Sequence, residues 1–122
     1  MVKRVLIVED EPNIAEALSF LLEREGYSVS LASDGEKGIA SARSERPSAI
    51  VLDIMLPRKN GFEVLRELRG DPSIARTPVV MLTARGQAHD RRAACENGAN
   101  VYLTKPFSNR KVIEEIKRLV AP

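Results

Sequence analysis

Short apolar segments and stretches of helical periodicity alternate five times along this chain, and this alternation limits its possible folds more than any other feature. Short continuous apolar runs are typical of strands covered on both faces. The runs are Val5–Val8, Ala49–Leu52, Val79–Leu82 and Val101–Leu103, with a weaker alternating segment at Tyr27–Leu31. Helices are expected from Glu11-Pro12 to Gly26 and over Gly35–Glu45, Phe62–Arg69, Gln87–Asn97 and Asn109–Val120. Because parallel neighbours need crossover connections, the pattern predicts an α/β fold with one doubly wound, five-stranded parallel sheet and five helices.

The length, composition and charge of the chain favour one globular domain. Its 122 residues suit a single domain over 1–122 with no effector domain, and 43% hydrophobic with 30% charged residues is an ordinary globular composition. A net charge of +2 gives no reason to expect contact with nucleic acid or a membrane. Apolar runs of about four residues are too short to cross a bilayer, so a cytoplasmic location is expected. Cys95 is the only cysteine, which rules out an intramolecular disulfide, and we expect it to be buried.

Polar side chains follow four of the predicted strands at the point where each strand ends. Glu9 and Asp10 come after the first strand, Asp53 after the third, Thr83 after the fourth, and Lys105 shortly after the fifth. In a doubly wound sheet the ligand site lies outside the carboxyl ends of the strands, where the strand order reverses. We therefore expect three carboxylates, a hydroxyl and an amine to meet at one edge of the sheet.

These residue types together suit phosphoryl transfer. Crowded carboxylates repel one another unless a cation lies among them, and oxygen ligands of this kind suit Mg²⁺. An ionised Asp53 is then a nucleophile that can form an acyl phosphate, while Lys105 and Thr83 offer a positive charge and a hydroxyl donor. Taken alone, Asp10 is explained equally well as a helix cap, and Glu11 is better explained as a first-turn helix residue. Asp53 lacks such an explanation, because a loop and not a helix follows it.

A wider resemblance rests on several motifs: Ile7-Val8-Glu9-Asp10-Glu11, Leu52-Asp53-Ile54-Met55-Leu56-Pro57, Gly61, Val80-Met81-Leu82-Thr83-Ala84-Arg85, Gly98-Ala99 and Tyr102-Leu103-Thr104-Lys105-Pro106-Phe107. With these motifs the chain closely resembles receiver domains of bacterial two-component response regulators, the CheY-like group. The likeness covers essentially the whole chain and is strongest to receivers of OmpR/PhoB-type transcription factors. It implies a flavodoxin-like sheet with strand order 2-1-3-4-5.

The resemblance also implies a phosphoacceptor and a metal site. Asp53 would accept a phosphoryl group from a sensor histidine kinase or phosphotransfer protein, with Mg²⁺ held by Glu9, Asp10, Asp53 and the backbone carbonyl of Met55. In this family, side chains at Met55 and Arg85 lie over the acyl phosphate, and an apolar Met55 predicts slow self-dephosphorylation. The domain would be a signalling protein that catalyses only its own phosphorylation and dephosphorylation.

A switch follows from the same resemblance. Thr83 and Lys105 would contact the phosphoryl group, and the bond between Lys105 and Pro106 would be cis. On phosphorylation Thr83 would move inward and Tyr102 would follow it into space beside Ala84, which changes the face of the fourth helix, fifth strand and fifth helix for an output partner. Without the motif, Tyr102 would be interpreted as a half-buried aromatic residue of an edge strand.

The sequence departs from the OmpR/PhoB pattern on that same face. Activated relatives of this type usually pair through it, using two acidic residues after Gly-Ala, and these are Asn100 and Val101 here. In the fifth helix Lys111 stands where an acidic residue is usual, and Glu115 where a basic one is usual. Like charges across an interface oppose association, so this pairing is not expected.

Two other functions fit part of the pattern. Haloacid-dehalogenase-like phosphatases also form an aspartyl phosphate, but they carry a second Asp two residues after the nucleophile, where this chain has Met55. A phosphorylation-independent interaction module would not need Asp10, Asp53, Thr83 and Lys105 together. The glycine-rich nucleotide motifs are missing from the sequence, so nucleotide binding is not indicated.

Overall fold

The predicted strands form one parallel sheet in the computed structural model, which describes residues 2–83, 88–104 and 108–121. The strands are β1 (Arg4–Val8), β2 (Ser28–Ala32), β3 (Ala49–Asp53), β4 (Val79–Thr83) and β5 (Val101–Thr104). Their order is β2-β1-β3-β4-β5, and every neighbouring pair is parallel. The expected topology is confirmed.

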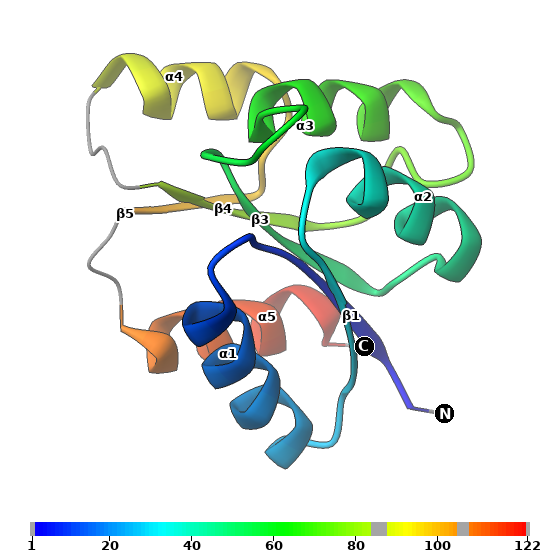
Figure 1. Ribbon diagram of the computed structural model, residues 1–122, viewed down its shortest axis with the longest axis vertical. Coiled ribbons are helices and arrows are strands. Elements are labelled where there is room, and N and C mark those ends of the chain that lie inside the picture. Colours follow the sequence, from blue (N-terminus) through cyan, green and yellow to red (C-terminus); the bar gives the residue numbers. More distant parts are fainter. Residues whose placement is uncertain (1, 84–87, 105–107, 122) are drawn as a thin grey trace.

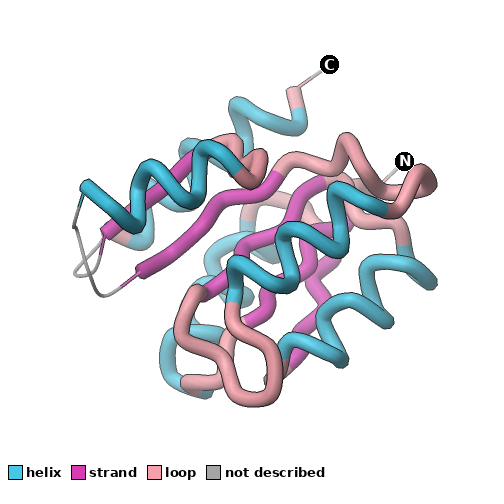
Figure 2. Tube along the Cα trace, turned by 90° about the horizontal axis from the view of Figure 1, so that it is seen from above, coloured by secondary structure: helices cyan, strands magenta, loops and turns pink. Residues whose placement is uncertain are grey.

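The helices of the described ranges cover both faces of this sheet. They are α1 (Pro12–Arg24), α2 (Gly35–Glu45), α3 (Gly61–Gly70), α4 (Ala88–Glu96) and α5 (Asn109–Val120). α1 and α5 lie on one face, and α2, α3 and α4 lie on the other (Figure 1). Figure 2 shows the strands running behind helices of one layer when the molecule is seen from above. None of the described helices is long and apolar enough to span a membrane.

Alternate residues of the central strands pack into two separate cores. On β1, Leu6 and Val8 contact the layer of α2, α3 and α4, whereas Val5 and Ile7 contact the layer of α1 and α5. β3 and β4 follow the same rule and are buried over their whole length. Burial on both faces explains why these strands appear in the sequence as continuous apolar runs and not as alternating ones.

Three local expectations need adjustment. β3, β4 and β5 each extend one residue further than predicted, so that Asp53 and Thr83 end their strands instead of following them. Cys95 is exposed, and its predicted burial is wrong, because α4 turns Ala94 and not Cys95 into the core. Glu11 occupies the cap position before α1 with no side-chain capping bond, so the predicted first-turn role is also wrong.

Candidate functional site

Three carboxylates converge where β1 and β3 end side by side. Glu9 and Asp10 follow β1, Asp53 is the last residue of β3, and Val8 of β1 pairs in register with Leu52 of β3. One oxygen from each carboxylate lies within 4.8 Å of the other two. Glu9 is 4% exposed and Asp53 1% exposed, whereas Asp10 is exposed to solvent. The strand order reverses at β1, so the cluster occupies the edge at which a doubly wound sheet binds ligands.

The cluster has the composition and spacing of a site for a hard divalent cation. Carboxylate oxygens are the ligands that Mg²⁺ prefers, and one or two carboxylates with water commonly complete its shell. Two of the three groups are buried, so their mutual repulsion is weakly screened by solvent. A cation among the three oxygens offsets this repulsion. The residues present therefore fit the expected metal.

The segment after β3 is folded tightly around Asp53. The Ile54 amide donates to the Leu82 carbonyl of β4 at 2.9 Å, and the Met55 amide donates to Asp53 Oδ1 at 3.1 Å. The Gly61 amide then returns to the Ile54 carbonyl at 2.9 Å and closes the loop. These bonds fix the Asp53 carboxylate relative to the loop that follows β3.

Gly61 allows this closure because it has no side chain. A β-carbon at Gly61 would lie 2.6 Å from the Asp53 carbonyl oxygen and 2.7 Å from Ile54 Cα. Real β-carbon contacts are not this short, so another residue would push the start of α3 away from the end of β3. The position of Asp53 therefore depends on a glycine eight residues further along the chain.

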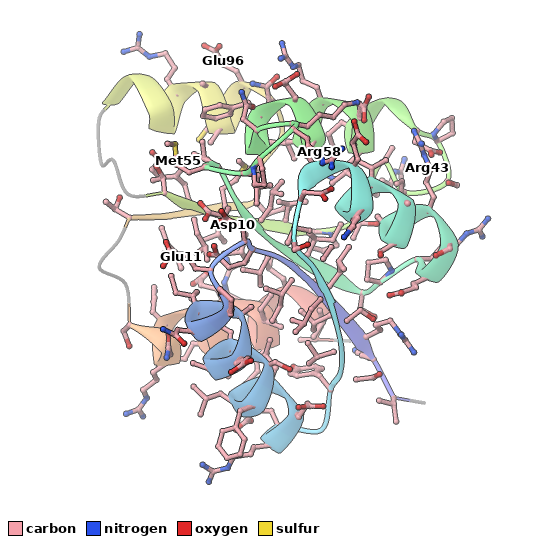
Figure 3. The ribbon with its side chains drawn as sticks, in the orientation of Figure 1. Asp10, Glu11, Arg43, Met55, Arg58 and Glu96 are labelled. Carbon is pink, nitrogen blue, oxygen red and sulfur yellow. The ribbon has the colours of Figure 1, made fainter. Side chains whose placement is uncertain are left out.

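A shallow groove leads away from the carboxylates across this loop. Asp10 and Thr83 border it at the site, Met55 is 56% exposed beside them, and Phe62 of α3 lies on its wall. Figure 3 shows Asp10 and Met55 at the same edge of the sheet, with Glu11 next to Asp10. The groove opens the acidic cluster to solvent on this side.

The switch residues lie partly within the described structure. Thr83 ends β4, is 1% exposed and borders the groove. Tyr102 of β5 pairs in register with Met81 and is half-buried against the core of α2, α3 and α4. Lys105, Ala84 and Pro106 lie outside the described residues, as does the segment with Arg85.

Two contacts of the loop that follows β3 were not predicted from the sequence. Asn60 caps α3, and its side chain accepts from the Glu63 amide at 3.0 Å while Glu63 accepts from the Asn60 amide at 3.3 Å. The spacing Asn60-x-x-Glu63 is a capping-box signal that could have revealed it. Arg58, in the loop after β3, forms an ion pair with Asp34 at the start of α2. No sequence pattern predicts this ion pair, because Arg58 and Asp34 lie far apart in the sequence.

Comparison with known proteins agrees with this fold and site. The family model described as "Response regulator receiver domain" matches residues 5–117. The sensor histidine kinase PA1611 of Pseudomonas aeruginosa has a receiver domain with a magnesium ion coordinated in its active-site cleft. Its solved structure superimposes with a TM-score of 0.90 at 32% identity, and the alignment covers 100% of both chains.

Curated relatives are transcriptional regulators of about twice this length. The chain is 43% identical to the alkaline phosphatase synthesis regulator PhoP of Bacillus subtilis over 120 residues, which is 98% of this chain and 49% of the relative. It is 44% identical to the DNA-binding regulator RpaA of Synechocystis over 117 residues, or 96% of this chain and 48% of the relative. The chain thus spans about half the length of these relatives.

The fold and the acidic site define a phosphoryl-accepting signalling domain, not a conventional enzyme. The chain belongs to the response regulator receiver family and is a receiver domain of two-component phosphorelay signalling. In this class the phosphoryl group is carried on an aspartate, and the cluster of Glu9, Asp10 and Asp53 is consistent with a Mg²⁺-dependent phosphorylation site.

Gly61→Ala is predicted to lower the free energy of unfolding by about 2 kcal/mol, because the added methyl group overlaps the backbone that carries Asp53. Gly70→Ala is the matched control at the other end of α3, where a β-carbon meets nothing within 4 Å. It should raise stability by about 0.5–1 kcal/mol through helix propensity. Urea unfolding followed by circular dichroism measures both changes. A Gly61→Ala variant as stable as the parent protein would contradict the close approach.

Proposed function

We propose that Asp53 accepts a phosphoryl group from the phosphohistidine of a sensor histidine kinase or phosphotransfer protein. The observation that carries this proposal is the position of Asp53, a buried carboxylate grouped with Glu9 and Asp10 where β1 and β3 end. Mg²⁺ is held by these three side chains and the Met55 carbonyl. When bound, the metal offsets negative charge on the carboxylates and on the transferring group.

The transfer exchanges one bond to phosphorus for another. An ionised Asp53 oxygen attacks the phosphorus atom, an O–P bond forms, and the N–P bond to the donor imidazole breaks. The departing nitrogen keeps the electron pair of that bond. The Met55 amide donates to Asp53 Oδ1 at 3.1 Å and so limits rotation of the carboxylate.

Thr83 and Lys105 are proposed to receive the new phosphoryl group. The Thr83 hydroxyl donates to a phosphoryl oxygen, and the Lys105 ammonium supplies positive charge. The peptide bond between Lys105 and Pro106 is proposed to be cis. Movement of Thr83 toward the phosphoryl group opens space beside Ala84 for Tyr102. This is a local charge event that biases a two-state packing arrangement. Two observations support this proposal. Thr83 borders the groove, and the half-buried Tyr102 lies on β5, the strand that pairs with the strand of Thr83.

The output of the switch belongs to a larger system. We propose that residues 1–122 act as the receiver domain of a cytoplasmic pathway, and that the face of α4, β5 and α5 signals to an effector domain or a separate partner. Curated relatives such as RpaA are DNA-binding regulators about twice as long as this chain, which supports an effector outside the receiver. Direct contact of the receiver itself with nucleic acid or a membrane is not proposed.

Acetyl phosphate and Mg²⁺ are predicted to add the mass of one phosphoryl group to the intact protein. Asp53→Asn should gain no mass, because an amide oxygen is a poor nucleophile, and removal of Mg²⁺ with EDTA should suppress the gain. Intact-mass spectrometry measures this change. A phosphatase would consume the donor without lasting modification, and a phosphorylation-independent module would do neither. Equal phosphorylation of Asp53→Asn would refute the assignment of the acceptor.

Met55→Asn is predicted to shorten the lifetime of the phosphorylated state. The exposed Met55 side chain has no polar group to orient an attacking water molecule, whereas Asn would supply one. Hydrolysis should be on the order of tenfold faster, a part of the gain that a full general base gives. Met55→Leu is the matched control and should keep the parent lifetime. Loss of phosphoryl mass over time is the measurement, and equal rates for Asn and Leu would rule out this role.

The charges of the proposed output face are used within the molecule. Glu115 of α5 lies 2.6 Å from Arg118 and 3.5 Å from Lys111, and its side chain is 14% exposed. The hydrogen bond from Arg118, together with its charge and that of Lys111, holds the pKa of the Glu115 carboxyl below its ordinary value. Asn100 Oδ1 accepts from the Val79 amide at 2.9 Å. These groups already form ion pairs and hydrogen bonds within one chain, so they are less available to bind a second copy.

The protein is therefore predicted to remain monomeric when activated. Sedimentation velocity with and without beryllofluoride, which mimics the phosphoryl group, should give one monomer boundary at micromolar concentration. Lys111→Glu together with Glu115→Lys restores the usual charges on α5 and provides the comparison. A clean dimer of the parent chain on activation would show that this face pairs despite its altered charges.

A further inference from the structure

We infer that Arg58 is a positioning residue for the Mg²⁺ site, acting through the loop that carries the Met55 carbonyl, and this rests on the proposed function. Arg58 has a φ of 70°, the left-handed region that side chains other than glycine rarely adopt. The Lys59 amide donates to the Pro57 carbonyl at 2.8 Å, which closes a three-residue γ-turn with Arg58 at its centre. A γ-turn with positive φ is rare and strained.

Strain of this kind persists only where surrounding contacts impose it, and it concentrates near functional sites. Arg58 Nε lies 3.8 Å from Asp34 Oδ2, at the start of α2. The other oxygen of Asp34 accepts from the Lys37 amide at 2.8 Å and caps the helix. Asp34 is 7% exposed, so the anchor is a fixed, buried carboxylate, whereas the Arg58 side chain is 67% exposed. Figure 3 shows Arg58 beside α2.

A second contact presses the same turn against α2. A β-carbon at Gly35 would lie 2.5 Å from the Lys59 carbonyl oxygen and 2.8 Å from Lys59 Cβ, so the helix start and the loop backbone are in direct contact. Lys59 also pairs with Glu67 of α3 at 2.5 Å. The residue after Arg58 is therefore held by both α2 and α3.

The short connection to Met55 transmits this anchoring to the metal site. Only Leu56 and Pro57 separate Met55 from Arg58, and the Leu56 amide donates to the Ile54 carbonyl at 3.1 Å, bending the chain at Met55. The ring of Pro57 fixes its own φ. Few soft torsions remain, so a shift of Arg58 moves the Met55 carbonyl relative to Asp53.

Charge alone predicts the opposite of positioning. Arg58 is a cation near a cation site, so a purely Coulombic role means that its removal tightens Mg²⁺ binding. A positioning role means that its removal weakens Mg²⁺ binding, because the loop relaxes and the carbonyl leaves its place. The sign of the change in affinity therefore separates the two.

The experiment is an amide NMR titration of the unphosphorylated protein with MgCl₂. Arg58→Ala should raise the dissociation constant for Mg²⁺ by about two- to fivefold, the range that corresponds to a partly exposed ion pair. Arg58→Lys keeps the charge and should retain most of the affinity. Asp34→Asn keeps the helix cap, since Asn caps well, but loses the charge. In the double variant Arg58→Ala/Asp34→Asn, the dissociation constant for Mg²⁺ should rise by less than the product of the two single increases. Both substitutions remove the same contact, the ion pair between Arg58 and Asp34.

Arg43→Ala is the matched control, since Arg43 lies on α2, the helix whose start Arg58 contacts. Arg43 pairs with Asp71 at 3.0 Å toward the other end of α2, so its removal costs one charge and one ion pair without touching the loop after β3. Mg²⁺ affinity should not weaken in this variant. Arg58→Gly is a second test variant, in which the γ-turn loses its strain as well as its ion pair. It should melt higher than Arg58→Ala and still bind Mg²⁺ less tightly than the parent protein.

The outcomes are distinguishable. Unchanged or tighter Mg²⁺ binding in Arg58→Ala overturns the positioning role and leaves the proposed function intact. So does equal weakening in Arg43→Ala, since it would show that the effect does not depend on the contact between Arg58 and the start of α2. If the parent protein fails to bind Mg²⁺, the proposed metal site itself is refuted, and the role of Arg58 falls with it. Thermal unfolding without Mg²⁺ verifies that each variant is folded.

Discussion

Repulsion between the carboxylates of Glu9, Asp10 and Asp53 is the constraint on which this domain depends. The register of β1 with β3 brings the three groups within 4.8 Å, and two of them are buried where solvent screens poorly. Their backbone positions are fixed unless the two central strands slip, and a slip would exchange the residues that face the two cores. Core packing therefore holds like charges together, and a divalent cation relieves the repulsion. The same arrangement that costs stability without metal creates affinity for metal.

Sequence patterns predicted the sheet, its helices and the meeting of the carboxylates, because these follow from periodicity and from the rule that parallel strands end at one edge. They failed where the answer depends on a small rotation or a distant contact. Cys95 and Ala94 are neighbours on α4, and only packing decides which of them is buried. The left-handed conformation of Arg58 could likewise not be predicted, since Arg has no special preference for it and its partner, Asp34, lies at the start of α2, far away in the sequence.

Hydrogen bonds from Arg69 hold part of the proposed output face in place, and these bonds do not involve the carboxylates of the acidic site. Arg69 of α3 donates to the Gly98 carbonyl at 2.8 Å, to the Thr77 carbonyl at 2.6 Å and to Asn100 Oδ1 at 3.1 Å. It thereby ties the end of α4 and the start of β5 to α3, at the opposite ends of the strands from Asp53. Asn100 is exposed and stands where an acidic residue is usual, and its amide oxygen accepts from both Arg69 and the Val79 amide.

The two sides of the acidic site are held in different ways, and this difference gives a direction to the switch. On the β3 side, closure at Gly61, the capping box at Asn60 and the anchored turn at Arg58 leave the loop little freedom. On the β4 side, Thr83 ends a buried strand and borders the groove. We propose that a phosphoryl group on Asp53 meets the fixed loop on one side, so that the adjustment falls on Thr83. In this proposal, movement of Thr83 is passed toward Tyr102, because β4 and β5 are adjacent strands in register.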